Sequence, residues 1–254
     1  MSRQQNRNRV RGKVYIVGAG PGAPGLMTVR GREVLGKADM VVYDRLVGKG
    51  VLSMIPRAAK RVDAGKSGGS HRLEQDEINE LIAEHARAGE VVVRLKGGDP
   101  FLFGRGAEEA EFLAERGIPF EVIPGVSSAT AVPTVAGIPI THRDLASAVT
   151  IVTGHGSKGG RKVDWAKLAK LDSTIVVMMG ARDLASIAGK LVRGGRPAST
   201  PAAVVERGTH PEQVTVVGTL KDIGKIAARA NINPPAIIVI GDVVRFRARL
   251  KVQE

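Results

Sequence analysis

Short apolar runs that alternate with helical segments constrain the fold of this chain more than any other feature of its sequence. Runs such as VTIVT (149–153) and AIIVIG (236–241) are apolar or β-branched almost throughout, which is typical of strands covered on both faces. Because strands alternate with helices, the sequence predicts an α/β protein whose sheets are at least partly parallel. The predicted strands span residues 14–18, 40–43, 60–63, 91–96, 120–123, 149–153, 174–179, 202–206, 214–217 and 236–241.

The clearest helical pattern lies between Ser70 and Gly89. Ser70 can cap the helix, acidic residues follow it, and apolar side chains then recur three and four positions apart. Further helices are predicted near residues 26–37, 105–116, 181–193 and 219–230.

The number of predicted strands indicates two domains. About ten strands are many for one open sheet but suit two α/β domains, each with a roughly five-stranded mixed sheet flanked by helices. Glycine and proline are concentrated over 117–139, which places the junction close to Pro124 and Gly125. We therefore expect a disordered basic leader over 1–12, an N-terminal domain over 13–124 and a C-terminal domain over 125–250.

The chain carries 38 Lys and Arg residues against 25 Asp and Glu residues, a net charge of +13. Two explanations stay open: a solvated basic surface, or a ligand rich in carboxylate or phosphate groups. A nucleic-acid-binding module is a third reading, but base stacking needs aromatic side chains, and these make up only 3% of the residues. We expect no nucleic-acid partner.

Composition also bears on location and on metal binding. No apolar run approaches the roughly 20 residues that span a bilayer, and the N-terminus lacks an apolar signal core. The absence of cysteine excludes disulfides and thiolate metal sites, and the five histidines show no metal-ligand spacing. We expect a cytoplasmic protein with no membrane partner and no metal.

Glycine-rich turns follow several of the predicted strands. The turn after the first strand, GAGPGAPG (18–25), matches the loose G-x-G-x-x-A fingerprint of dinucleotide sites. However, Pro21 and Pro24 remove amides that a pyrophosphate would need. A nucleotide-dependent oxidoreductase therefore remains an alternative that depends on this match alone.

The strand 91–96 ends in Gly97-Gly98-Asp99-Pro100. Two residues without a Cβ atom allow a ligand to lie against the backbone, while Asp99 either contacts that ligand or braces the turn. The segment PGVSS (124–128) repeats this design at a helix start, and glycines close several later strands. Since ligands of open α/β sheets bind at the carboxyl ends of the strands, we expect an extended site lined by main chain.

Seven motifs carry a resemblance to a known family. They are, in order, VGAGPGAPGLMT, ADMVVYDRLV, RLKGGDPFLFGRGAEE, IPGVSSATAVPTVAGIPITHRD, VTGH, MMG and ERGT. From about residue 13 to 249 the chain resembles the tetrapyrrole methylases, and most specifically their uroporphyrinogen-III C-methyltransferase branch. The resemblance implies two α/β domains with S-adenosyl-L-methionine (SAM) in the cleft between them, and a homodimer. Siroheme synthases of this family add a dehydrogenase–chelatase domain, which this chain is expected not to contain.

The resemblance also implies a reaction. Uroporphyrinogen III would be methylated at C2 and then at C7, through precorrin-1, to give precorrin-2 for siroheme or cobalamin synthesis, with S-adenosyl-L-homocysteine (SAH) as the second product. Lys and Arg side chains would pair with the carboxylates of the substrate. Another precorrin or cobalt-precorrin C-methyltransferase is the alternative within the family.

The implied site residues follow from the motifs. Asp44 corresponds to the family's proton acceptor and Lys66 to its proton donor. The implied SAM-binding residues are Pro21, Gly97, Gly98, Asp99, Leu102, Ser127, Ser128, Met179 and Gly208. Simpler roles stay open: Asp44 as a turn cap, Lys66 as a solvated loop lysine, Met179 as a core residue, and the two serines as helix caps.

Overall fold

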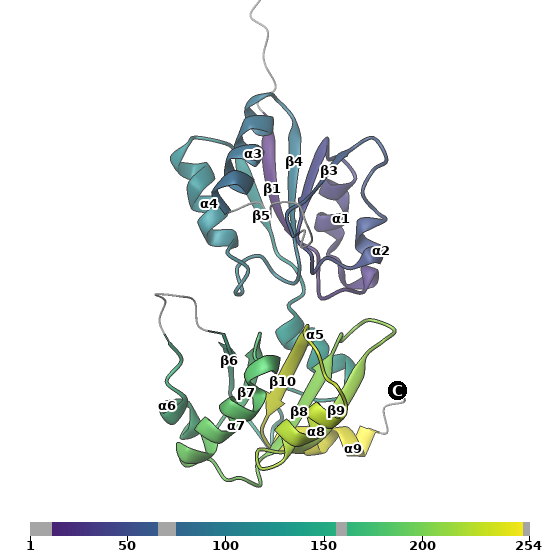
Figure 1. Cartoon of the computed structure of the whole chain (residues 1–254). Coiled ribbons are helices and arrows are strands. Elements are labelled where there is room, and N and C mark those ends of the chain that lie inside the picture. The colour runs from purple at the N-terminus through teal and green to yellow at the C-terminus, as the bar shows by residue number, and fades with distance from the viewer. Residues whose placement is uncertain (1–11, 66–74, 156–161, 251–254) are drawn as a thin grey trace, which may run out of the picture. The chain divides into compact units, whose positions relative to one another are not determined.

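The computed structural model describes residues 12–65, 75–155 and 162–250 of the chain (Figure 1). The chain divides into two compact units, Met1–Ser127 and Ser128–Glu254. The expected junction at Pro124 and Gly125 lies a few residues before this division. The expected leader lies outside the described residues, apart from Gly12.

The first unit holds a five-stranded sheet in the order β3-β2-β4-β1-β5, in which all neighbouring strands run parallel. Its strands are β1 (Lys13–Gly18), β2 (Met40–Tyr43), β3 (Lys60–Asp63), β4 (Val91–Lys96) and β5 (Phe120–Ile123). The expectation of five strands is confirmed, but the expectation of a mixed sheet is wrong for this unit. Because a helix-containing crossover joins each strand to the next, every strand enters the sheet in the same direction.

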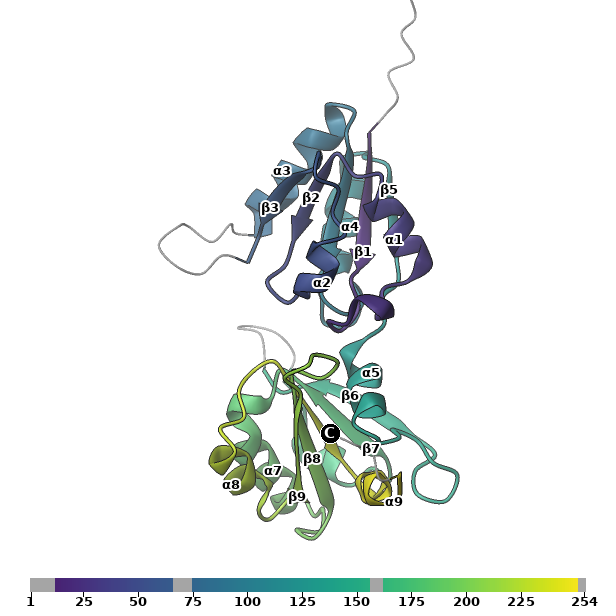
Figure 2. The same ribbon diagram turned by 90° about the vertical axis from the view of Figure 1, so that its right-hand side faces the viewer.

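Helices cover both faces of the first sheet (Figures 1 and 2). The short 3₁₀ turn η1 (Pro24–Leu26), α1 (Val29–Leu35) and α2 (Lys49–Leu52) follow β1 and β2, and the two α-helices contribute to one hydrophobic cluster. In contrast, α3 (Gln75–Arg87) and α4 (Gly106–Glu115) contribute to a second cluster on the opposite face. The predicted cap of α3, Ser70, lies outside the described residues.

Side chains of β4 alternate between these two faces, as the period of a strand requires. Val93 and Leu95 pack in the cluster with α1 and α2, whereas Val92 packs in the cluster with α3 and α4. Arg94 and Lys96 share the face of Val92. Two basic side chains therefore enter the buried layer between the sheet and α4.

The second unit holds a mixed five-stranded sheet in the order β6-β7-β10-β8-β9. Its strands are β6 (Val149–Thr153), β7 (Thr174–Met178), β8 (Pro201–Glu206), β9 (Val214–Thr219) and β10 (Ala236–Ile240). β6 is parallel to β7, while β10 is antiparallel to both β7 and β8. The carboxyl ends of β6, β7 and β8 therefore lie at one edge of this sheet.

Helices also cover both faces of the second sheet (Figure 2). One face packs against α6 (Trp165–Ala169), α7 (Leu184–Arg193), which the 3₁₀ turn η2 (Ala181–Asp183) precedes, and α8 (Ile223–Arg229). The other face contacts α5 (Ser128–Val135) and the 3₁₀ segment η3 (Asp242–Phe246), which continues into α9 (Arg247–Leu250). Each of the ten predicted strands is confirmed to within two residues of its expected bounds.

Candidate functional site

The carboxyl ends of all five strands of the first unit meet at one edge of its sheet, because these strands are parallel. The chain leaves β1 toward α1 on one face and leaves the adjacent β4 toward α4 on the opposite face. Neighbouring strands whose connections depart to opposite faces form a topological switch point, where open α/β sheets bind their ligands. The topology therefore indicates the carboxyl ends of β1 and β4 as the candidate ligand-binding position.

Hydrogen bonds between backbone groups join the turns that follow β1 and β4 at this switch point. The N–H of Gly20 donates to the carbonyl of Gly98 over 3.2 Å, and the N–H of Gly98 donates to the carbonyl of Gly20 over 2.8 Å. Both residues have positive φ, 77° for Gly20 and 71° for Gly98, in the left-handed region that favours glycine. A Cβ atom at Gly18 would lie 2.5 Å from the nitrogen of Gly125, so the turn after β5 packs here too.

Asp99 ties two of these turns together. One oxygen of its carboxylate accepts from the N–H of Phe101 over 2.9 Å, and the other accepts from the N–H of Gly125 over 3.0 Å. This geometry agrees with the bracing role that the sequence left open for Asp99. Pro21 lies half-buried beside Gly20, and Leu102 and Ser127 are half-buried on turns of the same unit.

Gly97 has a reason to be glycine that involves no ligand. A Cβ atom at this position would lie 2.9 Å from the Cβ of Leu46, on the turn after β2. The first glycine of the pair therefore accommodates a neighbouring segment of the protein. Gly98, with its positive φ, shapes the turn.

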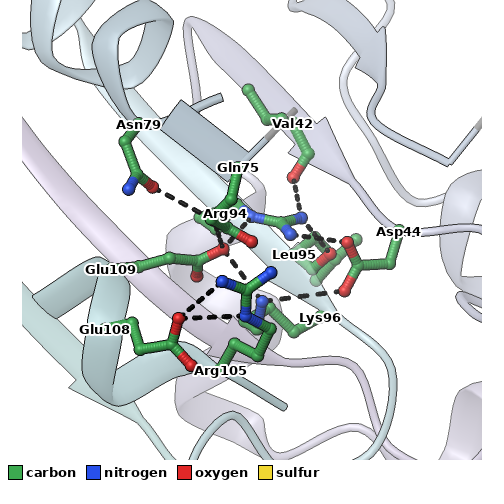
Figure 3. A network of polar contacts seen from close by, with 10 residues as sticks. All are labelled: Val42, Asp44, Gln75, Asn79, Arg94, Leu95, Lys96, Arg105, Glu108 and Glu109. Atoms are coloured by element: carbon green, nitrogen blue, oxygen red, sulfur yellow. Dashed lines mark hydrogen bonds and ion pairs between the residues drawn. The ribbon is translucent and has the colours of Figure 1, made fainter. Parts of the chain in front are cut away.

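Asp44 ends β2 at the same edge of the sheet. Its N–H donates to the carbonyl of Leu95 over 3.1 Å, which fixes its backbone to β4. Its Oδ1 lies 2.5 Å from Nη2 of Arg94, and its Oδ2 lies 3.8 Å from Nζ of Lys96 (Figure 3). The Asp44 side chain is 33% exposed, so the carboxylate lies between two buried cations and the surface.

A polar network lies beneath Asp44 (Figure 3). Nε of Arg94 and Nζ of Lys96 both donate to Oε1 of Glu109, over 2.9 Å and 3.0 Å. Gln75 donates to the same oxygen over 3.0 Å. Arg94, Lys96 and Glu109 are each only 2% exposed. Within the part of the chain that the structure describes, Oε2 of Glu109 has no hydrogen-bond partner.

Burial and the neighbouring carboxylates have opposite effects on the pKa values of the basic residues in this network. Burial disfavours the charge of Arg94, but Glu109 and Asp44 outweigh that effect and raise its pKa. Burial lowers the pKa of Lys96, and the charge of Arg94 lowers it further, although Glu109 and Asp44 act in the other direction. With all four groups ionised, two cations balance two carboxylates, which is the arrangement that buried charges require.

The corresponding edge of the second sheet is built differently. Met179 follows β7 with φ 54°, and Arg207 and Thr209, with φ 46° and 74°, flank Gly208 after β8. Residues other than glycine rarely adopt this backbone conformation, and such residues cluster at functional sites. The Met179 side chain is 53% exposed, which is contrary to the alternative that it fills the core.

Packing explains the glycines at this edge. A Cβ atom at Gly208 would lie 2.7 Å from Cγ2 of Val132 on α5, and one at Gly180 would lie 3.0 Å from Cδ1 of Ile187 on α7. Ser128 is the first residue of α5 and is half-buried. These small residues bring the strand ends close to their covering elements.

One expected site residue cannot be placed, and the three buried charged residues of the network were not expected. Lys66 lies outside the described residues. Arg94, Lys96 and Glu109 were not predicted, although basic residues at alternate positions of an apolar strand are a usable signal, since lysine and arginine are rarely buried unless paired.

The described segments also bear on metals and membranes. Over residues 12–65, 75–155 and 162–250, no group of three or more His, Cys, Asp or Glu side chains is arranged to hold a metal ion. No helix in these segments has the length and apolar character that crossing a membrane requires.

Comparison with known proteins gives consistent matches. The family model of the Tetrapyrrole (Corrin/Porphyrin) Methylases matches residues 13–224. An S-adenosyl-L-methionine-dependent uroporphyrinogen III methyltransferase of Methanosarcina barkeri is 49% identical, over 92% of this chain and 93% of its own length. Siroheme synthase 2 of Aeromonas hydrophila is 47% identical over 97% of this chain, but this chain spans only 52% of that protein.

Solved structures give the same picture. The uroporphyrin-III C-methyltransferase of Thermus thermophilus complexed with S-adenyl homocysteine superposes with a TM-score of 0.80 at 41% identity, covering 92% of this chain and 99% of that chain. A cobalt precorrin-4 methyltransferase of cobalamin biosynthesis superposes with a TM-score of 0.81 at 28% identity, covering 91% of this chain and 95% of that chain.

Proposed function

The chain belongs to the tetrapyrrole (corrin/porphyrin) methylase family, and we propose that it transfers methyl groups from SAM to carbon atoms of uroporphyrinogen III. The observation that carries this proposal is the 49% identity with a uroporphyrinogen III methyltransferase over nearly the full length of both chains. Methyl transfer from SAM to carbon is the activity that its sequence and structural relatives share.

The charge of the chain supports the substrate. Uroporphyrinogen III is a cyclic tetrapyrrole with acetate and propionate arms, so it is a polyanion at neutral pH. A net charge of +13 favours its approach, and Lys and Arg side chains form charge-assisted hydrogen bonds with carboxylates. Of the two explanations that composition left open, a polycarboxylate ligand is the one we propose.

The proposed reaction proceeds in two steps, at C2 to give precorrin-1 and at C7 to give precorrin-2. Bound SAM supplies a methyl group on a sulfonium: the S–CH₃ bond breaks, a C–CH₃ bond forms, and the bonding pair stays on the sulfur of SAH. The pyrrole that supplies the nucleophilic carbon is left with a positive charge and loses a proton. The residues of the protein orient the reactants and manage this charge.

We propose SAM-binding roles, on the family resemblance, for residues of each unit taken by itself. In the first unit they are the main chain at Gly97 and Gly98 with Pro21, Leu102 and Ser127, while Asp99 holds two turns in place through its hydrogen bonds. In the second unit they are Ser128, Met179 and Gly208. The exposed Met179 side chain and the left-handed backbone at this edge fit a ligand-binding role.

Asp44 is the residue that we propose to act on the charged intermediate. Its carboxylate is partly exposed at the carboxyl edge of the first sheet, where it can accept a proton from the methylated ring or stabilise the cation. Lys66, at the family's proton-donor position, remains part of the proposal on the resemblance alone.

The test is an anaerobic incubation of the protein with SAM and enzymatically made uroporphyrinogen III. The mass of the tetrapyrrole should rise by two methyl groups, with two equivalents of SAH formed. A single added methyl group, or none, would contradict the proposed product. The similarity to a cobalt precorrin-4 methyltransferase makes methylation of a later intermediate the second candidate, and incubation with cobalt-precorrin substrates tests it.

The alternative reading as an oxidoreductase rested on the glycine spacing over 18–23. The positive φ of Gly20, and the carbonyl oxygen of Leu26 that would lie 2.9 Å from a Cβ atom there, account for a glycine at position 20 without a dinucleotide. Titration with NAD and with SAH, followed by calorimetry, compares the two ligands directly: we expect heat of binding for SAH alone.

We also propose that the protein is a homodimer in the cytoplasm, as the family resemblance implies. Size-exclusion chromatography with light scattering should give twice the chain mass of 26.8 kDa. A monomer mass over a range of protein concentrations would contradict the proposed dimer.

A further inference from the structure

We infer that Arg94 and Lys96 are positioning residues, which fix the carboxylate of Asp44 at the edge of the first sheet and act on the reaction only through it. This inference rests on the proposed role of Asp44 in methyl transfer. It assigns a function to Arg94, Lys96 and Glu109, three residues of the motif RLKGGDPFLFGRGAEE to which the resemblance assigned no role.

The two cations hold Asp44 from different sides (Figure 3). Arg94 contacts Oδ1 over 2.5 Å, while Lys96 lies 3.8 Å from Oδ2. The backbone of Asp44 is tied to β4 by its own N–H. The orientation of the carboxylate is therefore set by partners on both oxygens as well as by the strand.

Glu109 in turn fixes the cations. Arg94 uses Nε for Glu109 and Nη2 for Asp44, so its planar guanidinium cannot rotate without losing one partner. Lys96 bridges the same two carboxylates. Because both basic side chains are 3% exposed, water has little access to replace a lost contact. The network is consequently rigid from α4 to the edge of the sheet.

Exposure decides which member of the network can meet a ligand. Of the four charged groups, Asp44 alone has substantial exposure, at 33%, whereas Glu109 is 2% exposed. The network therefore ends in one partly exposed carboxylate, at the position where positive charge on the substrate is proposed to develop.

Stability alone is a weak explanation for this arrangement. Buried ion pairs often contribute no more to stability than apolar residues of the same volume. Two buried cations aimed at a partly exposed carboxylate are instead what a preorganised site requires, since a displacement of about 1 Å can lower a rate by roughly a hundredfold.

The first experiment is the substitution Lys96→Met, which removes one of the two cations and keeps an unbranched side chain that is one atom shorter. The rate constant kcat for methyl transfer should fall on the order of tenfold to a hundredfold, whereas KM for uroporphyrinogen III and the Kd for SAH change less than about twofold. Lys13→Met is the matched control. Lys13 pairs with Glu121 at the opposite end of β1, and this variant should keep the wild-type kcat.

A double-mutant cycle then separates positioning from other roles. If Lys96 acts only through Asp44, Lys96→Met should have almost no further effect on kcat in an Asp44→Asn background. Multiplicative losses in the double variant would overturn the inference. So would a wild-type kcat in Lys96→Met.

A second variant, Arg94→Lys, keeps the buried positive charge and so guards against misfolding. A single ammonium lacks the two-sided fork of arginine, so kcat should fall while the unfolding midpoint stays close to that of the wild type. Unchanged kcat in this variant contradicts the role of Arg94. Absence of methylation by the wild-type protein would overturn the proposed function and this inference together, whereas an active wild type with an unimpaired Asp44→Asn variant overturns the inference alone.

Discussion

The strand ends of the two units are organised differently, the first by charged side chains and the second by backbone conformation. In the first unit, Asp44 rests on a buried network of charged side chains. In the second unit, the buried polar side chains among the described residues are those of Ser173 and Thr174, and neither is charged. That edge is shaped instead by left-handed backbone at Met179, Arg207 and Thr209. The comparison indicates that buried charges organise the strand ends of the first unit, whereas backbone conformation organises those of the second.

The largest expected effect concerns the charge beneath Asp44. Glu109→Gln removes the buried anion that Arg94 and Lys96 share, and breaking a buried ion pair from one side costs about 3–5 kcal/mol of unfolding free energy. The control Glu121→Gln alters two partly exposed pairs, with Lys13 and with Arg30, and each should cost less than about 1 kcal/mol. Urea unfolding of both variants measures the difference, and equal losses would remove the distinction between the buried network and a surface pair.

Asp44→Asn should lower kcat by about a hundredfold, because the amide can neither take a proton nor carry a negative charge. Binding of SAH, measured by calorimetry, should be preserved. Unchanged turnover would remove Asp44 from the mechanism, and with it the functional asymmetry between the two units.

Gly208→Ala tests the second edge. The added Cβ would lie 2.7 Å from Cγ2 of Val132, and overpacking of this kind costs about 1–3 kcal/mol. The double variant Gly208→Ala/Val132→Ala should recover part of the loss in thermal unfolding. Gly25→Ala is the control, because a Cβ atom there would have no neighbour within 4 Å. Absence of recovery would mean that packing against α5 is not the reason for this glycine.

The smallest expected effect is a change in the stability of the protein with pH. The pKa of Lys96 in the folded protein is lowered from 10.5, first by burial and then by Arg94. Between the lowered pKa and 10.5 the unfolded chain binds a proton that the folded chain does not, so the contribution of Lys96 to stability improves as pH rises through this window. The stability of wild type relative to Lys96→Met should therefore increase toward pH 10.5 in urea unfolding.

For Lys13, the expected change of stability with pH has the opposite sign. Its pKa is raised above 10.5, mainly by the hydrogen bond with Glu121, so its contribution is present below 10.5 and is lost as pH rises beyond that value. The stability of wild type relative to Lys13→Met should fall in that range. The same trend in both comparisons would contradict the assigned causes.

Most strands were predictable almost to the residue because they are short β-branched or apolar runs, although β3 (KRVD) is mostly charged. The direction of the strands was less accessible: the alternation with helices predicts parallel pairs, but whether all neighbouring strands are parallel depends on the order of the strands in the sheet, which the pattern does not give. Short helices such as α2 and α6 span four and five residues, too few to display a helical period.

The site was predictable where motifs are specific and unpredictable where chemistry is tertiary. The family motif points to Asp44, whose role stays a proposal, but the pairing of Arg94 with Glu109 joins a strand to a helix and has no local signature. Glu109 follows Glu108 in the first turn of α4, where acidic residues usually only complement the helix dipole. The close approach of Leu46 to Gly97 was also not predictable, because Leu46 lies on a segment distant in sequence.

The reciprocal hydrogen bonds between Gly20 and Gly98 have a consequence for the thermodynamics of binding. They fasten two adjacent loops to each other within the fold, so the conformational entropy of both loops is lost when the protein folds. A molecule that docks against these loops does not have to order them, and more of its contact energy appears as affinity.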